Sequence, residues 1–190
     1  MNTLLSVLLG IGLSAACGFR IFVPFLLVGI AARTGHVTLG STFAWMAGTP
    51  ALIALGVATV FEIAAYYVPW LDHALDVVAT PAAVVAGMVM TASVVTGLDP
   101  MLRWTLALIA GGGIAGTVQA LTVGTRKVSL LTTGGLANPV VSTVELLGAV
   151  FLTVLAIALP LLAFAVVAWA LFFGVRHLLR LIRRAGRAAA

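Results

Sequence analysis

Long apolar runs dominate the chain and constrain its fold more than any other feature. They cover residues 4–32, 43–67, 81–97, 104–123 and 139–175. Because about 20 apolar residues cross a bilayer as a helix, each run is near or above the length of a membrane-spanning helix. Only 8% of the 190 residues are charged, against about 25% in ordinary soluble domains. So few charges cannot cover the surface of a soluble globule, and we predict an integral membrane protein.

The lengths of the runs predict an all-α, polytopic transmembrane helix bundle of about five crossings. The first run is too long for one crossing, and Gly18, Arg20 and Pro24 interrupt it. This favours two half-helices that meet near residues 18–20, broken or re-entrant, over one kinked helix. The last run would extend about 55 Å as one helix. Because no Gly, Asn or Ser cluster lies near Pro160 to build a turn, we favour a single helix kinked there over two apposed segments.

Two segments between the runs are expected to lie outside the apolar core. Residues 69–78 place Asp72 and Asp76 on one helical face and apolar residues on the other, which predicts a short amphipathic helix on the membrane surface. Residues 124–138 form the longest polar interval and are expected to be a loop that holds Arg126 and Lys127.

Glycines within the runs are candidate breaks in the helix backbone. Gly18 precedes Arg20, and Gly111, Gly112 and Gly113 lie in the middle of the fourth run. Each glycine costs about 0.5–1 kcal/mol against alanine in a helix. The glycine run must therefore either permit close backbone packing or open a turn.

The formal net charge of +5 comes from the C-terminal end of the chain. Five arginines lie in residues 176–190, whereas residues 1–175 carry five acidic and five basic side chains. We therefore divide the chain into a transmembrane domain (1–175) and a basic tail (176–190) that the positive-inside rule puts in the cytoplasm. Five crossings then put Arg33 inside and the 69–78 helix outside. They also put Arg126 and Lys127 outside, against the rule, unless their loop folds back into the protein.

Ionisable groups within the runs are candidate functional residues, because each costs roughly 2.5–3.5 kcal/mol to insert. Three stand out: Arg20, Glu62 and Glu145. Arg20 and Glu62 either neutralise each other as a pair, or line a polar path in which one carboxylate binds or relays a cation or proton. Asn138 and Ser142 are spaced to face one cavity with Glu145. The Asn-Pro dipeptide can equally be a helix N-cap followed by a proline.

Other classes of function find little support in the sequence. One cysteine and three scattered histidines make neither a disulfide nor a metal site. The chain lacks the nucleophile-elbow, Walker A, zinc-protease and dinucleotide glycine motifs. We therefore expect no enzymatic activity, no cofactor and no metal. A neutral body also offers no basic face to nucleic acid.

A weak internal repeat relates residues 10–62 to residues 113–145. Each half runs from a glycine through small residues to Gly-x-Arg, and an X-Pro pair then opens an apolar helix with one glutamate. If the repeat is inverted, it matches the duplicated architecture of many transporters.

The motifs also resemble a known family. They are GLSAACGFRIF at residues 12–22, Glu62 followed by PWLDH at 69–73, the glycine run, and NPVVS with a glutamate three residues later at 138–145. In this order they resemble the small bacterial membrane proteins grouped as domain of unknown function 4126, over nearly the whole chain. The resemblance implies a multi-pass protein of the bacterial inner membrane and no assigned activity. Where it leads us to expect a charged residue after Glu62, this chain has Ala65-Tyr66-Tyr67.

Three hypotheses follow for the function. The first is a homo-oligomeric transporter or channel that moves a small ion or small solute past Arg20, Glu62 and Glu145. The second is a lipid-binding or lipid-translocating protein in which Arg20, Arg126 and Lys127 grip a lipid phosphate. The third is a non-transporting scaffold whose partners are membrane lipids, anchored by the arginine tail.

Overall fold

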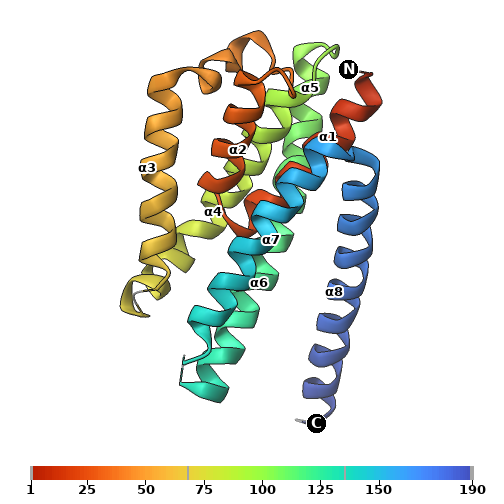
Figure 1. The fold of residues 1–190 in the computed structure, drawn as a ribbon. Coiled ribbons are helices and arrows are strands. Elements are labelled where there is room, and N and C mark those ends of the chain that lie inside the picture. Colours follow the sequence, from red (N-terminus) through yellow and green to blue (C-terminus); the bar gives the residue numbers. More distant parts are fainter. Residues whose placement is uncertain (1, 68, 135, 189–190) are drawn as a thin grey trace.

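The computed structural model describes the backbone of residues 2–67, 69–134 and 136–188, and their side chains except those of 69–77 and 178–188. This part of the chain folds into helices and contains no β-strand, as predicted. The first helix begins at one end of an elongated bundle, and the last helix ends at the other (Figure 1). We call these ends the N-terminal end and the tail end. The elements in order are α1 (Thr3–Phe19), α2 (Phe22–Arg33), η1 (Ser41–Ala47), α3 (Thr49–Ala65), α4 (Pro69–Val94), α5 (Pro100–Leu106), η2 (Ala107–Gly112), α6 (Gly113–Thr133), α7 (Asn138–Ala158) and α8 (Pro160–Ala188).

α1 and α2 form a broken hairpin inside the bundle. α1 enters from the N-terminal end, Arg20 adopts an extended backbone (φ −145°, ψ 136°), and α2 returns to the end at which α1 began (Figure 1). With 17 and 12 residues, the two helices are about 25 and 18 Å long, less than the roughly 30 Å of a bilayer core. The predicted break near residues 18–20 is confirmed. Because the hairpin turns back, Arg33 lies at the N-terminal end rather than on the side of the tail, where it was predicted.

In the described part of the chain, three helical stretches are long and apolar enough to cross a membrane: Pro100–Thr133, Asn138–Ala158 and Pro160–His177. η1 and α3, bent by 67° relative to each other, make a fourth if they are one span. The shorter apolar part of α4, Val78–Val94, belongs to a helix that also runs along the bundle (Figure 1). A polytopic membrane bundle is therefore confirmed. The first apolar run contributes a hairpin to it, and the last run contributes two helices.

The last apolar run is an antiparallel helix pair, so the prediction of one kinked helix is wrong. α7 ends at Ala158, Leu159 leaves the helical region (φ −139°, ψ 73°), and α8 runs back from Pro160 towards the tail end (Figure 1). A residue before proline is pushed out of the α region by a clash with the proline ring. A single residue therefore makes this turn. The pair brings the α6–α7 connection to the same end of the bundle as the tail.

The predicted surface helix at 69–78 is the first part of α4, which continues through Pro81 to Val94. It begins towards the tail end, whereas we predicted it on the side opposite the tail (Figure 1). The side chains of Asp72 and Asp76 lie outside the described residues.

The predicted loop at 124–138 is also mostly helix. α6 continues to Thr133 and leaves only residues 134–137 as a connection. Its threonines donate hydrogen bonds to carbonyl groups of their own helix, as Thr125 does to Leu121 and Thr132 to Val128. The polar side chains are thus compatible with a helix, and Arg126 and Lys127 lie on it.

Gly18, Gly111 and Gly112 are contact points between helices. A Cβ added to Gly111 would lie 2.5 Å from Thr91 Oγ1, and one added to Gly112 would lie 3.0 Å from Met88 Cγ, both on α4. η2 keeps its helical path as a π-helix, and α6 follows directly at Gly113. Gly18 is a helical residue of α1, where a Cβ would lie 2.6 Å from the carbonyl oxygen of Ala115 on α6. Of the two alternatives for the glycine run, Gly111 and Gly112 thus provide close packing. The backbone breaks at Arg20, two residues after Gly18.

α1 is held in the centre of the bundle by small and polar residues. The Ser14 hydroxyl lies 2.9 Å from the carbonyl oxygen of Gly87 and 2.6 Å from Thr91 Oγ1, both on α4. Gly12 packs against Ala156 of α7 and Ala163 of α8. These contacts fix the depth at which α1 ends, and thereby the position of Arg20.

Candidate functional site

Four buried side chains from four parts of the fold meet inside the bundle. We call them the arginine cluster: Arg20 at the α1–α2 break, Tyr66 just after α3, Arg126 on α6 and Glu145 on α7. None of the four is more than 6% exposed. The structure thus brings together Arg20, Arg126 and Glu145, which the sequence analysis named separately.

Both arginines contact the carboxylate of Glu145. Arg126 donates from Nε to Oε1 at 3.1 Å and from Nη2 to Oε2. Arg20 Nη2 lies 3.5 Å from the same Oε2. It also donates to the backbone carbonyl of Ser142 at 2.9 Å and to the Ser142 hydroxyl. A two-pronged guanidinium–carboxylate contact is among the strongest polar pairings in proteins, so Glu145 holds the two arginines together.

The ring of Tyr66 faces both guanidinium groups. Its centroid lies 3.9 Å from Arg20 Cζ and 4.1 Å from Arg126 Cζ. Each distance is well within the range of a cation–π interaction. Sequence analysis missed this role, because Tyr66 stands at the end of an apolar run where an aromatic belt is expected. One signal was present: Tyr66 is four residues after Glu62, on the same helical face.

Glu62 does not pair with Arg20, whose ion pair in the described chain is with Glu145. The Oε1 of Glu62 accepts a hydrogen bond from the backbone N–H of Ile21 at 2.7 Å, and the Oε2 of Glu62 accepts one from the backbone N–H of Phe22 at 3.0 Å. These N–H groups belong to the start of α2, where a helix has unpaired donors and a partial positive charge. Glu62 therefore caps α2 from α3 and stabilises the break that carries Arg20.

A line of buried polar residues leads from the cluster towards the tail end. It consists of Ser129 on α6 and of Asn138 and Ser142 on α7, and we call it the polar seam. Arg126 and Glu145 each lie seven residues from the tail-side end of their helix, which is about 10 Å. Asn138, Ser142 and Glu145, which were predicted to face one cavity, are all buried residues of α7. Asn138 is not the N-cap of this helix, because Ala137 holds that position.

Lys127 does not belong to the cluster. It follows Arg126 on α6, and successive helical residues point in different directions, so Lys127 is exposed while Arg126 is buried. Its predicted place in the binding site is therefore not supported by the geometry.

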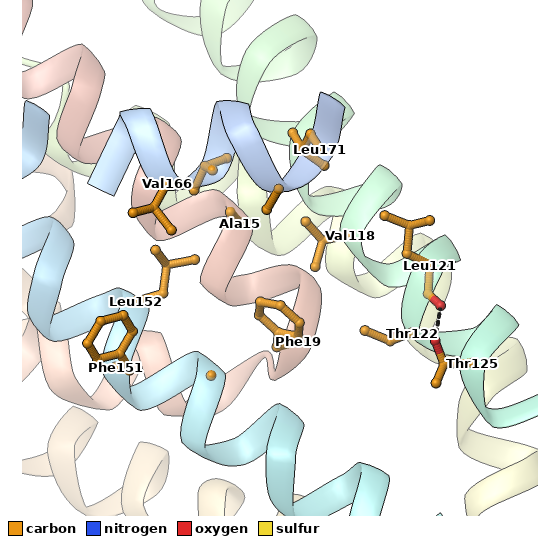
Figure 2. Close-up of a pocket in the computed structure, with 13 residues that line it drawn as sticks. Ala15, Phe19, Val118, Leu121, Thr122, Thr125, Phe151, Leu152, Val166 and Leu171 are labelled. Atoms are coloured by element: carbon orange, nitrogen blue, oxygen red, sulfur yellow. Dashed lines mark hydrogen bonds between the residues drawn. The ribbon is translucent and has the colours of Figure 1, made fainter. Parts of the chain in front are cut away.

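An apolar pocket of about 360 Å³ lies beside the cluster, between α1, α6, α7 and α8 (Figure 2). Its lining includes Phe19, which precedes Arg20, and Thr122, one turn before Arg126. Thr122 and Thr125 both donate their hydroxyl hydrogens to carbonyl groups of α6, and Figure 2 marks the Thr125 bond as a dashed line. The walls are therefore almost entirely apolar.

A second apolar pocket, of about 590 Å³, lies on the other side of the break. Ile21 and Phe22 line it together with residues of α3 and α4. Arg20 thus lies in the chain between residues that border two apolar pockets. Among the described residues, no three His, Cys, Asp or Glu side chains gather where they could hold a metal ion.

The helices, the broken hairpin and the buried arginine cluster together define a class: an integral membrane protein with ionised groups inside its helix bundle. Residues 7–180 match the family described as Domain of unknown function (DUF4126), and the chain belongs to this family. The resemblance noted from the sequence motifs is confirmed. Neither a curated protein nor a solved structure matches the chain significantly.

Proposed function

We propose that the protein transports a small ion or small solute across the bacterial inner membrane, with the arginine cluster as its binding site. The observation that carries this proposal is the convergence of Arg20, Arg126 and Glu145 at a helix break within the bundle. Ionised groups are costly in a membrane, and transporters place their sites at discontinuous helices. The polar seam supplies a path between the cluster and the tail end.

The partners of the two carboxylates favour a negatively charged solute. Glu145 is occupied by two guanidinium groups, and Glu62 by two backbone N–H groups. The sequence had suggested that one carboxylate binds or relays a cation or proton. With these partners, neither carboxylate is placed to act as the main ligand of a cation. The arginines therefore bind the solute, Glu145 holds them in its absence, and Glu62 positions Arg20.

The proposal is tested by flux into proteoliposomes that contain the purified full chain. We expect uptake of radiolabelled phosphate above that of protein-free liposomes, and no such uptake of sodium. Glu145→Gln and Arg126→Gln should each lower uptake at least about tenfold. Lys127→Gln is the matched control, because it removes one positive charge from the next, exposed position and should leave uptake unchanged. Equal uptake by protein and protein-free liposomes for both probes, or unchanged uptake in Glu145→Gln, contradicts the proposal.

A second candidate, lipid-phosphate binding and translocation, is favoured by the apolar pocket beside the cluster. Arg20 and Arg126 would bind the phosphate, while an acyl chain lies in the pocket. Gly148 lines this pocket and has room for a side chain, since the nearest atoms to an added Cβ are 3.9 Å away. Gly148→Leu should therefore slow movement of fluorescent phosphatidylglycerol between leaflets and leave phosphate uptake unchanged. Equal lipid movement with and without the protein contradicts this candidate.

The remaining parts of the proposal concern the setting of the protein. We place the basic tail in the cytoplasm, in contact with anionic lipids. We also propose a homo-oligomer without enzymatic activity, cofactor or nucleic-acid partner. A non-transporting scaffold is less well supported, because it needs neither a buried cluster nor a polar seam.

A further inference from the structure

The second apolar pocket, of about 590 Å³, separates α3 from the described part of α4. Leu55 of α3 lines one side, and residues that include Val85 of α4 line another. α3 itself packs on α2 and η1. Every described residue that lines the pocket is apolar or aromatic. The pocket therefore leaves α3 and α4 without direct packing over this stretch.

A space of this kind does not stay empty in a membrane. Helix bundles contain few voids larger than a water molecule, and water would find no hydrogen-bond partners on the described apolar walls. Two lining side chains, Trp45 and Val85, are 59% and 57% exposed. The pocket is thus open to the surface of the bundle, which faces lipid. Apolar groups of the surrounding bilayer can fill it.

The length of the pocket matches one lipid acyl chain. On α4 its lining extends from Val78 to Val89, which is about 16 Å of helix. One leaflet contributes about 15 Å, half of the roughly 30 Å hydrocarbon core of a bilayer. Ile21 and Phe22, at the break between α1 and α2, also line the pocket. An acyl chain that enters from one face of the membrane therefore ends inside the bundle, beside this break.

The N-terminal end of the pocket has the features of a lipid headgroup site. η1, which carries Trp45, lies at the N-terminal end of the bundle (Figure 1). Tryptophan is enriched at the headgroup level of membranes. Arg33 is exposed at the same end, and its Nη1 donates a hydrogen bond to Thr49 Oγ1 at 3.0 Å, at the start of α3. A cation at this level complements the charge of a lipid phosphate.

We propose that this pocket binds one acyl chain of a membrane phospholipid, with the lipid phosphate on Arg33. The bound chain packs α3 against α4. α3 carries Glu62, which caps α2, and Tyr66, which contacts the arginine cluster, follows it directly. The lipid therefore stabilises the helix that positions Arg20. This proposal goes beyond transport and holds whether or not the protein moves a solute.

Native mass spectrometry tests the site on the full chain, extracted in mild detergent from liposomes of phosphatidylglycerol and phosphatidylcholine. We expect one retained phospholipid per chain. Ala82→Phe places a ring in the pocket and should lower the fraction of chains with a lipid at least about fivefold. Ala54→Phe is the matched control, because it adds the same ring at an exposed position of α3 outside the pocket and should leave this fraction unchanged.

Two further measurements test the position of the headgroup. Arg33→Gln should lower the retained fraction about two- to fivefold, as expected for an exposed ionic contact. Phospholipids brominated near the ester end of the chain should quench Trp45 more than those brominated near the methyl end. The fluorescence of Trp45 is taken as the difference between the unchanged protein and Trp45→Phe. The opposite order of quenching overturns the proposal, because the chain would then enter from the other end.

Equal lipid retention in Ala82→Phe and Ala54→Phe also overturns the proposal, since the lipid would then be bound all around the bundle. The same holds if a second copy of the chain is retained in place of a lipid and is lost in Ala82→Phe, because the pocket would then be a subunit interface. Thermal melting followed by circular dichroism checks that each variant is folded. If Ala82→Phe does not fold, Val85→Phe, at an exposed position of the wall, replaces it with the same expected loss.

Discussion

Tyr66 shows how one aromatic side chain allows two arginines to share a buried site. Arg20 and Arg126 carry the same charge, and both lie about 4 Å from its ring. The electron-rich face of the ring attracts each cation without adding a charge of its own. The aromatic ring therefore stabilises both arginines through its contacts with their guanidinium groups.

This role predicts different effects for two substitutions of Tyr66. Tyr66→Phe keeps the ring and its contacts with both guanidinium groups, whereas Tyr66→Leu removes them. We expect Tyr66→Leu to be less stable than Tyr66→Phe by about 1–2 kcal/mol, since each desolvated cation–π contact contributes on that order. Chemical denaturation in detergent micelles measures the difference. Equal stability of the two variants would show that the ring contacts contribute nothing.

At the scale of elements, the crossing of α4 with η2 depends on the absence of side chains. A Cβ on Gly87 would lie 2.5 Å from Ala115 Cβ and 2.6 Å from the carbonyl oxygen of Gly111. Gly87→Ala should therefore destabilise the protein by about 1–3 kcal/mol, the usual range for overpacking. Gly113→Ala is the control from the glycine run, because no atom lies within 4 Å of its added Cβ. It should be neutral or stabilising by up to about 1 kcal/mol. Thermal unfolding of both variants tests this contrast, which fails if Gly113→Ala is the more damaging.

Some features of the helices could be predicted from the sequence, and others could not. The break at Arg20 was predictable, because glycine, proline and a charge interrupt an apolar run there. The return of α2 was not, since it depends on a cap that Glu62 supplies from 40 residues away. The α7–α8 turn was missed because its one non-helical residue, Leu159, carries no turn signal except the proline after it.

The candidate site was predicted in part. Arg20, Glu145 and Ser142 stood out as polar groups in apolar sequence, and they do meet. Arg126 was named together with its neighbour Lys127, in an expected loop, as a candidate contact for a lipid phosphate. Its side chain reaches Glu145 because α6 continues through that interval with a buried polar face. Which of two adjacent cations faces inwards depends on the packing of α6, and a sequence alone does not give this.

At the scale of the whole molecule, the antiparallel α7–α8 pair removes a conflict in the charge distribution. One long final helix would place Lys127 and the basic tail on opposite sides of the membrane. In the structure, α6 and α8 both end at the tail end (Figure 1). Lys127 and the tail arginines then lie on one side, as the positive-inside rule requires. The distribution of charge thus agrees with two helices in the last run, and we propose a cytoplasmic tail end on this ground, although Arg33 lies at the other end.

This topology predicts the side from which introduced cysteines react with a membrane-impermeant maleimide. Leu136→Cys in the α6–α7 connection and His177→Cys on α8 should be labelled in inverted vesicles, and Met101→Cys at the start of α5 in intact cells. Leu136 and Met101 are 86% and 80% exposed, so their cysteines are accessible. The unchanged protein gives the background, because Cys17 is buried. Labelling of Leu136→Cys and His177→Cys from opposite sides would mean that α7 and α8 together cross the membrane once, and the proposed path along the polar seam would then open on the outer face.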